Sequence, residues 1–145
     1  MPLQSTGTAH WEGDLLSGTG TTSLESGAAT GLPLTWNART EEHGILTSPE
    51  ELIAAAHASC FSMSLANGLA KNGNPPANLV TSATATFDRT DAGYRILTMA
   101  ITVRGDVPGL DDHSFREAAE VAKENCPVSQ ALKGNVEISV DAALA

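Results

Sequence analysis

Apolar and polar residues alternate along two neighbouring segments in the middle of the chain, residues 79–88 and 94–104. In the second segment every other residue from Leu97 to Val103 is apolar, and the residues between them are polar or small. A period of two residues is typical of a strand that buries one face. Residues 90–93 contain Asp and Gly and form the expected turn, so we expect the two strands to pair antiparallel.

Further strands are expected near both ends of the chain. Residues 6–12, 20–25 and 34–40 form short candidate strands in a region rich in Thr and Ser, and glycines between them supply the turns. These strands are expected to pair as antiparallel hairpins. Near the C-terminus, every other residue from Val136 to Val140 is apolar, which predicts a closing strand.

A long helix is predicted between these two groups of strands. Ser48 can cap it, Pro49 suits its first position, and Glu51 completes a capping box. The helix is expected to run to Lys71, because an Asn-Gly pair follows as a stop signal.

Two shorter helices are predicted before the closing strand, at residues 112–124 and from Cys126-Pro127 to Gly134. The order βββ-α-ββ-αα-β predicts an α+β fold, in which antiparallel sheets pack on a long central helix and on shorter helices. With 145 residues the chain has the length of a single domain, residues 1–145, and can bury a core without disulfide or metal staples.

The chain is strongly acidic, with 17 Asp and Glu against 8 Lys and Arg and a formal net charge of −9 at pH 7. This charge argues against binding to nucleic acids or to anionic membrane surfaces, which requires clustered basic residues. The first ten residues contain neither a basic residue nor an apolar run, so we expect a cytosolic protein without a secretory signal. Polar residues interrupt the apolar stretch 52–70, which therefore predicts a buried helix instead of a membrane span.

Cys60 and Cys126 are the only cysteines. In the cytosol such a pair is more often catalytic, metal-binding or part of the core than a structural disulfide. Cys60 lies on the apolar face of the long helix, where a cysteine can simply be a small core residue. Cys126 precedes Pro127 at the start of a helix, where free backbone N–H groups favour the nucleophilic and oxidisable thiolate. A redox role for Cys126 is therefore chemically reasonable.

Three other residues carry candidate chemistry. Arg39 is the only basic residue among the first 70; it can be a surface charge, but a guanidinium beside a thiol would hold that thiol as a thiolate. Glu50, in the first turn of the long helix, complements the helix dipole. His57 precedes Cys60 by three residues, but zinc needs three or four ligands and the other histidines lack ligand spacing. We therefore expect no metal, and no haem or flavin motif is present.

Several segments resemble one protein family over nearly the whole chain. Residues 9–14, 18–20 and 25–27 resemble its N-terminal hairpin, residues 49–63 resemble its central helix, and residues 126–130 (CPVSQ) resemble its second cysteine motif. The family is that of osmotically inducible protein C (OsmC) and the organic hydroperoxide resistance proteins (Ohr). The Ala-His before the first cysteine and the CPVSQ run are closer to the OsmC branch.

This resemblance implies an intertwined homodimer with active sites at the subunit interface, and a thiol-dependent peroxidase that reduces organic hydroperoxides in oxidative or osmotic stress. It implies that Cys60 is the peroxidatic cysteine, Cys126 the resolving cysteine and Glu50 the family's carboxylate, and Arg39 matches the arginine of the OsmC branch. Cys60 would form a sulfenic acid that condenses with Cys126 to a disulfide. The family further implies a dithiol reductant of the dihydrolipoyl type.

Glu50 is expected about 15 Å from Cys60 along one helix, because ten residues separate them at about 1.5 Å each. Two copies of the helix that cross antiparallel near residue 55 would bring Glu50 of each chain beside Cys60 of the other, so we expect Glu50 to act in the partner's site. Two alternatives stay open. One is a binding or structural domain with two core cysteines, and the other is a thiol–disulfide oxidoreductase, which the absence of a C-x-x-C motif disfavours.

Overall fold

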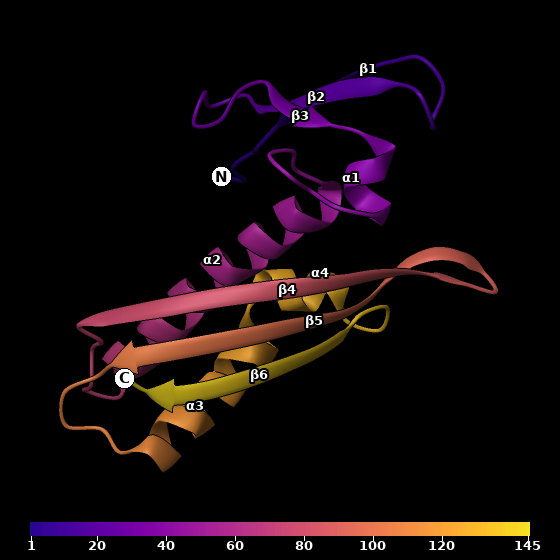
Figure 1. Ribbon diagram of the computed structural model, residues 1–145. Coiled ribbons are helices and arrows are strands. Elements are labelled where there is room, and N and C mark those ends of the chain that lie inside the picture. Colours follow the sequence, from indigo (N-terminus) through magenta and orange to yellow (C-terminus); the bar gives the residue numbers. More distant parts are fainter. The chain divides into compact units, whose positions relative to one another are not determined.

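The computed structural model describes residues 1–145 and consists of two units, Met1–Pro49 and Glu50–Ala145. Three short strands form an antiparallel sheet in the first unit. β1 (Gly7–Glu12) pairs with β2 (Thr19–Leu24), and β2 pairs with β3 (Leu32–Leu34) (Figure 1). The strands expected at the first two positions are therefore confirmed.

The ring of Trp11 explains why the first hairpin contains glycines. Trp11 on β1 stands opposite Gly20 on β2, and a Cβ at Gly20 would lie 2.7 Å from the ring. A Cβ at Gly18 would lie 2.9 Å from the same ring and would also clash with backbone oxygens. The indole Nε1 donates a hydrogen bond of 3.0 Å to the carbonyl of Gly13. The ring thus packs closely on backbone that only glycine leaves uncovered.

The strand expected at residues 34–40 is wrong beyond Leu34. Residues 36–40 form a helix instead, α1 (Trp36–Thr40). Its N-cap is Thr35, whose backbone is extended and whose side-chain oxygen accepts a hydrogen bond of 3.2 Å from the N–H of Ala38. A threonine cap satisfies a free N–H of the first turn, which favours the helix over a continued strand.

The second unit contains a sheet of three longer strands. β4 (Asn78–Thr90) and β5 (Gly93–Asp106) form an antiparallel hairpin, as the alternating pattern predicts. β6 (Glu137–Leu144) pairs with β5 in the parallel direction, which corrects the expectation that the sheets are antiparallel throughout. A parallel neighbour needs a crossover connection, which α3 (Asp112–Asn125) and α4 (Pro127–Leu132) provide. The α+β class and the order of the expected elements are confirmed, with α1 as an addition.

α2 (Pro49–Lys71) is the long predicted helix. Pro49 occupies its first position, and two glutamates follow in the first turn. The helix ends where the Asn-Gly pair predicts, since Gly73 has a φ of +87°, a left-handed conformation that glycine adopts without strain. α2 runs without interruption over 23 residues, so regular helical geometry relates the positions on it.

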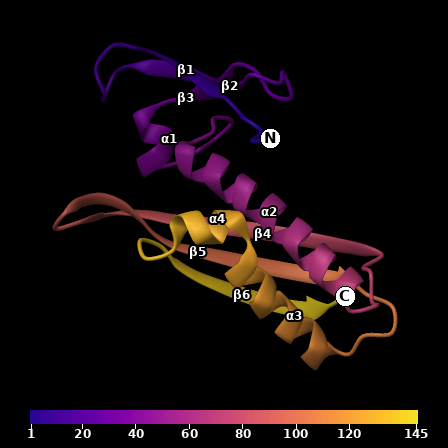
Figure 2. The ribbon, with the colours of Figure 1, turned by 180° about the vertical axis from the view of Figure 1, so that it is seen from behind.

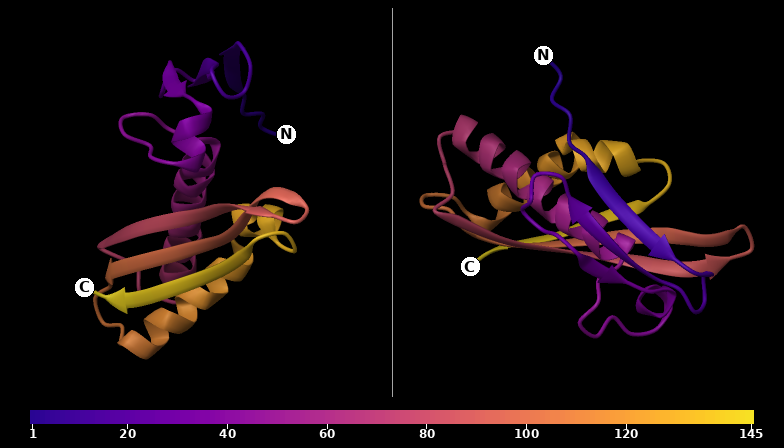
Figure 3. Two further views of the ribbon diagram at one scale, coloured as in Figure 1. Left: turned by 45° about the vertical axis from the view of Figure 1, so that its right-hand side comes forward. Right: turned by 90° about the horizontal axis from the view of Figure 1, so that it is seen from above.

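All three helices of the second unit lie on one face of its sheet, as seen from behind (Figure 2) and in two further views (Figure 3). Buried apolar side chains from both layers fill the space between helices and sheet. The largest contributions are Phe61, Leu65 and Leu69 of α2, Met99, Ile101 and Val103 of β5, and Phe115, Ala119 and Ala122 of α3. Spacings of three or four residues on the helices and two on the strand each present a single face to this core.

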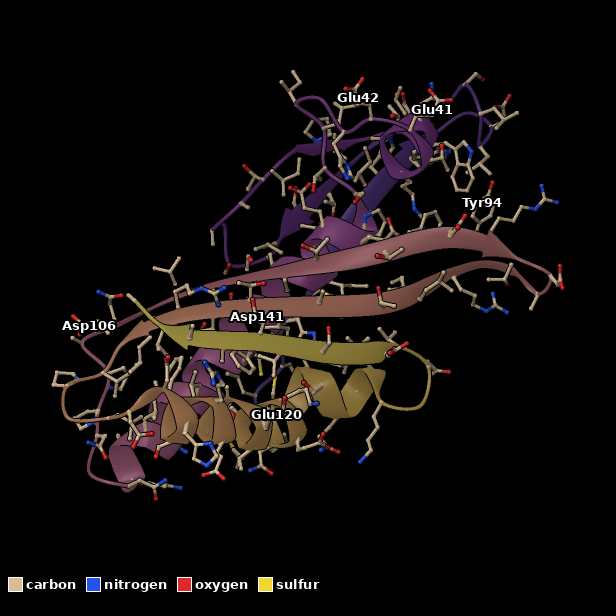
Figure 4. The ribbon with its side chains drawn as sticks, turned by 60° about the horizontal axis from the view of Figure 1, so that its bottom comes forward. Glu41, Glu42, Tyr94, Asp106, Glu120 and Asp141 are labelled. Atoms are coloured by element: carbon tan, nitrogen blue, oxygen red, sulfur yellow. The ribbon has the colours of Figure 1, made fainter.

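The opposite face of this sheet is mostly polar, although Val80 on β4 is an exposed apolar residue there. Arg104 on β5 forms an ion pair of 2.9 Å with Asp141 on β6, and the two side chains are 43% and 71% exposed. Figure 4 shows Asp141 on β6 and Asp106 at the end of β5, whereas Glu120 belongs to α3. An exposed ion pair contributes about 0–1 kcal/mol, so the unit is held together through its helix-covered face.

α2 is also long and apolar enough to cross a membrane, by length and composition alone. This corrects the expectation that its polar residues rule out a span on composition. Three of its side chains, Phe61, Leu65 and Leu69, fill the core of the second unit, which is how a core helix is arranged. However, only 28% of its most apolar stretch is buried within the chain.

We predict that Gly105→Ala destabilises the second unit by about 1–3 kcal/mol, which is typical of overpacking. A Cβ at Gly105 on β5 would lie 2.7 Å from the fully buried ring of Phe115 and 3.1 Å from Leu79. The matched control is Gly68→Ala on α2, where no atom lies within 4 Å of the added Cβ. There we expect a gain of about 0.5–1 kcal/mol, because alanine is the better helix former. Urea unfolding measures both, and equal stability of the two variants would contradict the packing described.

Candidate active site

Cys60 lies near the middle of α2 and packs against the edge of the hydrophobic core. Its side chain is half-buried, so part of it remains open to solvent in the chain. This thiol is the more accessible of the two.

Cys126 is the single residue that joins α3 to α4. It ends α3, because its N–H donates to the carbonyl of Ala122 (2.9 Å), and it begins α4, because its carbonyl accepts from the N–H of Gln130 (3.0 Å). The predicted N-cap position is therefore confirmed. Its thiol makes no capping hydrogen bond and is fully buried in the core, with 0% exposure.

The two thiols are free and lie close together, and the thiol of Cys126 acts on the ionisation of Cys60. Burial is the main cause that raises the pKa of Cys60 above its ordinary value. The N–H of Val128, in the first turn of α4, opposes this by stabilising the thiolate, whereas the thiol of Cys126 adds to the increase. None of these groups is cationic, so the second unit by itself holds Cys60 as a neutral thiol at pH 7.

A buried hydrogen bond flanks this pair of thiols. His57 lies one turn before Cys60 on α2, and its Nε2 is 2.7 Å from the Oγ of Ser129, which lies three residues after Cys126. Both side chains are buried. The Nδ1 of His57 has no hydrogen-bond partner in the chain. Burial lowers the pKa of His57, so its ring is neutral at pH 7.

Glu50 does not reach Cys60 of its own chain. It lies in the first turn of α2 and is only 6% exposed. Since α2 is continuous between the two residues, they are about 15 Å apart along the helix axis. This distance exceeds the reach of a single side chain.

Arg39 belongs to the N-terminal unit, in the last turn of α1. Its guanidinium lies over the ring of Trp36, 5.5 Å from the ring centroid, which is a cation–π contact. It also lines a cavity of about 310 Å³ within this unit. The other lining residues carry no charge: Trp11, Leu15, Leu34, Thr35, Trp36 and Pro49.

Of the predicted site residues, the structure brings Cys60 and Cys126 together and keeps Glu50 of the same chain away from them. No group of three His, Cys, Asp or Glu side chains lies close enough to bind a metal ion. The sequence presents His57 only as a metal-ligand candidate and Ser129 only as part of a motif. A usable signal was nevertheless present, because each stands three residues from a cysteine, the spacing of neighbours on a helix surface.

The chain matches the family model described as OsmC-like protein over residues 42–141. It is 45% identical over 139 residues to peroxiredoxin OsmC of Escherichia coli (strain K12), covering 95% of this chain and 96% of that protein. It is 31% identical over 97 residues to the organic hydroperoxide resistance protein OhrB of Bacillus subtilis (strain 168), covering 66% and 68%. The crystal structure of an organic hydroperoxide resistance protein OsmC from Legionella pneumophila shares the fold, with a TM-score of 0.71 at 22% identity and coverage of 95% and 96%.

We predict that His57 makes the protein less stable in acid. Because burial lowers its pKa in the folded chain, the unfolded chain takes up a proton at a higher pH than the folded one does. Stability is therefore full above the unfolded value of about 6.5 and falls as the pH drops below it, by at most about 1.4 kcal/mol per pH unit. Urea unfolding at pH 7.5, 6.0 and 5.0, at one protein concentration, measures the effect.

The variant His57→Gln has no imidazole at this position, so it should lack the loss of stability in acid that His57 causes. The difference in unfolding free energy between parent and variant should therefore change between pH 7.5 and 5.0. His43→Gln, in an exposed loop position, is the control and should keep the parent's pH dependence. Parallel profiles of the parent and His57→Gln would contradict the prediction.

Proposed function

This chain belongs to the OsmC-like protein family and is a thiol-dependent peroxidase, and on that premise we propose that it reduces organic hydroperoxides to alcohols through Cys60 and Cys126. The observation that carries the proposal is the adjacency of two reduced thiols, of which one is half-buried and the other fully buried. A peroxide that arrives from solvent can meet Cys60 but not Cys126. Cys60 is therefore assigned as the peroxidatic cysteine and Cys126 as the resolving cysteine.

The reaction proceeds in two oxidative steps and one reductive step. The thiolate of Cys60 attacks an oxygen of ROOH, an S–O bond forms as the O–O bond breaks, and the alkoxide leaves as ROH after it takes up a proton. The sulfur of Cys126 then attacks the sulfenic acid sulfur, an S–S bond forms as the S–O bond breaks, and water leaves. A dithiol of the dihydrolipoyl type reduces this disulfide and becomes a disulfide itself.

The first step needs a thiolate, and burial acts against the thiolate of Cys60. We assign Arg39 as the cation that holds the thiolate and the peroxide oxygen, and Glu50 as the carboxylate that orients Arg39. Two observations support this assignment. The groups that act on Cys60 in its own unit include no cation, and Glu50 is a buried carboxylate, which requires a charged or hydrogen-bonding partner.

An alkyl or aryl group on the peroxide suits the cavity beside Arg39. This cavity has about 310 Å³, and Trp11, Leu15 and Trp36 give it apolar walls. Each CH₂ group buried there contributes about 0.8 kcal/mol, which favours an organic peroxide over H₂O₂. The relative from Bacillus subtilis is named for resistance to organic hydroperoxides.

We propose that the enzyme acts as an intertwined homodimer, in which both units of each chain, residues 1–145, belong to one OsmC-like domain. Only 28% of the most apolar stretch of α2 is buried within a single chain, and Met63 on this helix is 68% exposed. An apolar helix face of this extent requires a cover. The match to the relative from Escherichia coli covers 95% of the chain and so includes residues of both units.

We place the enzyme in the cytosol, in defence against oxidative and osmotic stress. The proposed cycle returns Cys60 and Cys126 to thiols after each turnover, which suits a reducing compartment. The net charge of −9 favours neither nucleic acid nor an anionic membrane as a partner.

We predict that the purified protein oxidises dihydrolipoamide fastest when cumene hydroperoxide is the oxidant. Two CH₂-sized groups buried in the cavity, at about 0.8 kcal/mol each, correspond to a kcat/KM about tenfold higher than with H₂O₂. Glutathione disulfide as the sole oxidant tests the alternative of a thiol–disulfide oxidoreductase. Turnover only with glutathione disulfide would support that alternative, and no turnover with any oxidant would support a binding or structural domain.

We predict that Cys60→Ser is inactive, because a serine hydroxyl is neither ionised at neutral pH nor oxidisable to a sulfenic acid. Cys126→Ser should react once with cumene hydroperoxide and then stop, with Cys60 left as a sulfenic acid or a mixed disulfide. Intact-mass measurement after one equivalent of peroxide identifies these products. Parent-like turnover by Cys60→Ser, or neither product in Cys126→Ser, would contradict the assigned roles.

We predict that Glu50 serves Cys60 of the partner chain. If two copies of α2 cross antiparallel near Ala55, a two-fold axis brings Glu50 of each chain beside Cys60 of the other. Ala55 and Ala56 are small and exposed in the single chain, so two helix backbones can approach there. Subunit exchange between Glu50→Ala and Cys60→Ser should then create one intact site per heterodimer and recover about half the parent activity per dimer.

The matched control exchanges Glu50→Ala with the double variant Glu50→Ala/Cys60→Ser. No chain in that mixture carries Glu50, so no activity should return. Absence of recovery in the first mixture, after mass spectrometry has verified exchange, would favour a carboxylate that acts within its own chain.

A further inference from the structure

The hydrogen bond between His57 and Ser129 has no part in the chemistry described so far. It joins α2 to α4 over 72 residues of sequence, with 2.7 Å between Nε2 and Oγ. His57 is 0% and Ser129 4% exposed, so water does not compete for this bond from the surface. Such a buried bond fixes the position of one helix against the other.

The bond forms one of two consecutive links between the same elements. His57 and Cys60 are three residues apart on α2, and Cys126 and Ser129 are three residues apart at the start of α4. Residues at this spacing are neighbours on a helix surface. His57 meets Ser129, and Cys60 meets Cys126. The hydrogen bond and the pair of thiols therefore lie side by side in one contact between α2 and the start of α4.

Disulfide formation depends strongly on that register. The S–S bond requires about 2.05 Å between the sulfurs and Cα atoms about 4.4–6.8 Å apart. Cys126 sits at the corner between α3 and α4, where its own thiol makes no capping hydrogen bond to hold it. A displacement of about 1 Å between reacting groups can cost about 100-fold in rate.

We propose that the buried hydrogen bond between His57 and Ser129 holds Cys126 in position to attack the sulfenic acid of Cys60, so that both residues are positioning residues for disulfide formation. This inference rests on the proposed function. The step is the condensation of Cys60–SOH with the Cys126 thiol, which forms the S–S bond and releases water, and neither positioning residue is consumed in it.

The unpartnered Nδ1 of His57 separates this role from simple core packing. A hydrocarbon side chain could fill the same space without leaving a buried nitrogen that has no partner in the chain. What the histidine adds over such a side chain is its bond to Ser129. The chain also offers a comparison, because Ser62 on α2 donates a bond of the same length, 2.7 Å, to Thr81 on β4, and that bond does not involve α4.

The test measures the two oxidative steps separately by rapid mixing with cumene hydroperoxide. Loss of the Cys60 thiol reports the first step. The ratio of dimedone-trapped sulfenic acid to disulfide reports the second, because dimedone and Cys126 compete for the same sulfenic acid. In His57→Leu and Ser129→Ala we expect the first step to stay within about twofold of the parent and the second to slow by about 10- to 100-fold. His57→Gln, whose amide nitrogen can occupy the place of Nε2, should recover much of the loss.

Two further variants show whether the effect belongs to this hydrogen bond. Ser62→Ala removes the comparison bond and should leave the second step unchanged. The double variant His57→Leu/Ser129→Ala should be no slower than the worse single variant, because both remove the same interaction. If His57→Leu does not fold, Ser129→Ala and His57→Gln carry the test.

Equal slowing of both steps in all variants, Ser62→Ala included, would overturn the inference and reduce the pair to general packing. So would a second step at the parent rate in Ser129→Ala. Oxidation with diamide needs no peroxide, so it distinguishes failure of the positioning role of His57 and Ser129 from failure of the proposed function. A parent that forms the disulfide with diamide but does not consume peroxide would contradict the function, whereas variants that form it as fast as the parent would contradict the positioning role.

Discussion

The contact between α2 and the corner that joins α3 to α4 is the constraint on which the rest of the structure depends. It carries both thiols and the His57–Ser129 hydrogen bond. The same helix continues into the core through Phe61, Leu65 and Leu69, which are buried to within 2% exposure. Because protein cores are close-packed, the fit of α2 against the core limits movement of Cys60, and the His57–Ser129 bond links the same helix to the corner that carries Cys126. The proposed redox site thereby lies on elements that pack against the core of the second unit.

This placement favours one half of the chemistry over the other. A fully buried Cys126 beside a half-buried Cys60 suits disulfide formation, since the partner is already adjacent and protected from direct oxidation. Burial also raises the pKa of Cys60 and so disfavours the thiolate that attacks the peroxide in the proposed reaction. A cation is the physical means to reverse this shift. The assignment of Arg39, which lines an otherwise uncharged cavity, therefore answers a requirement that the second unit itself creates.

How much the sequence predicts depends on whether the signal is local. α2 is found at its predicted ends, because the Pro49 start and the Gly73 stop are short-range signals. The strand expected at residues 34–40 fails because the cap from Thr35 outweighs an apparently extended pattern. The parallel pairing of β6 and the bond between His57 and Ser129 connect distant parts of the chain, so no local pattern reports them. The sequence indicates the pairing of Cys60 with Cys126 only through the motifs that resemble the family.

α2 is apolar on more than the face that packs in the core of its own chain, and this explains why its composition alone would suit a membrane span. One face is filled by the core of its own chain, but only 28% of the most apolar stretch is buried there. The small side chains of Ala55 and Ala56 lie on the uncovered side, near the midpoint between Glu50 and Cys60. A second copy of the helix that crosses at these alanines would cover this apolar surface. It would also bring Glu50 of one chain near Cys60 of the other, although the two residues are about 15 Å apart along the helix within one chain. Folding and catalysis would then require the same interface, since each chain would lack both a cover for α2 and a carboxylate for Cys60 without the other.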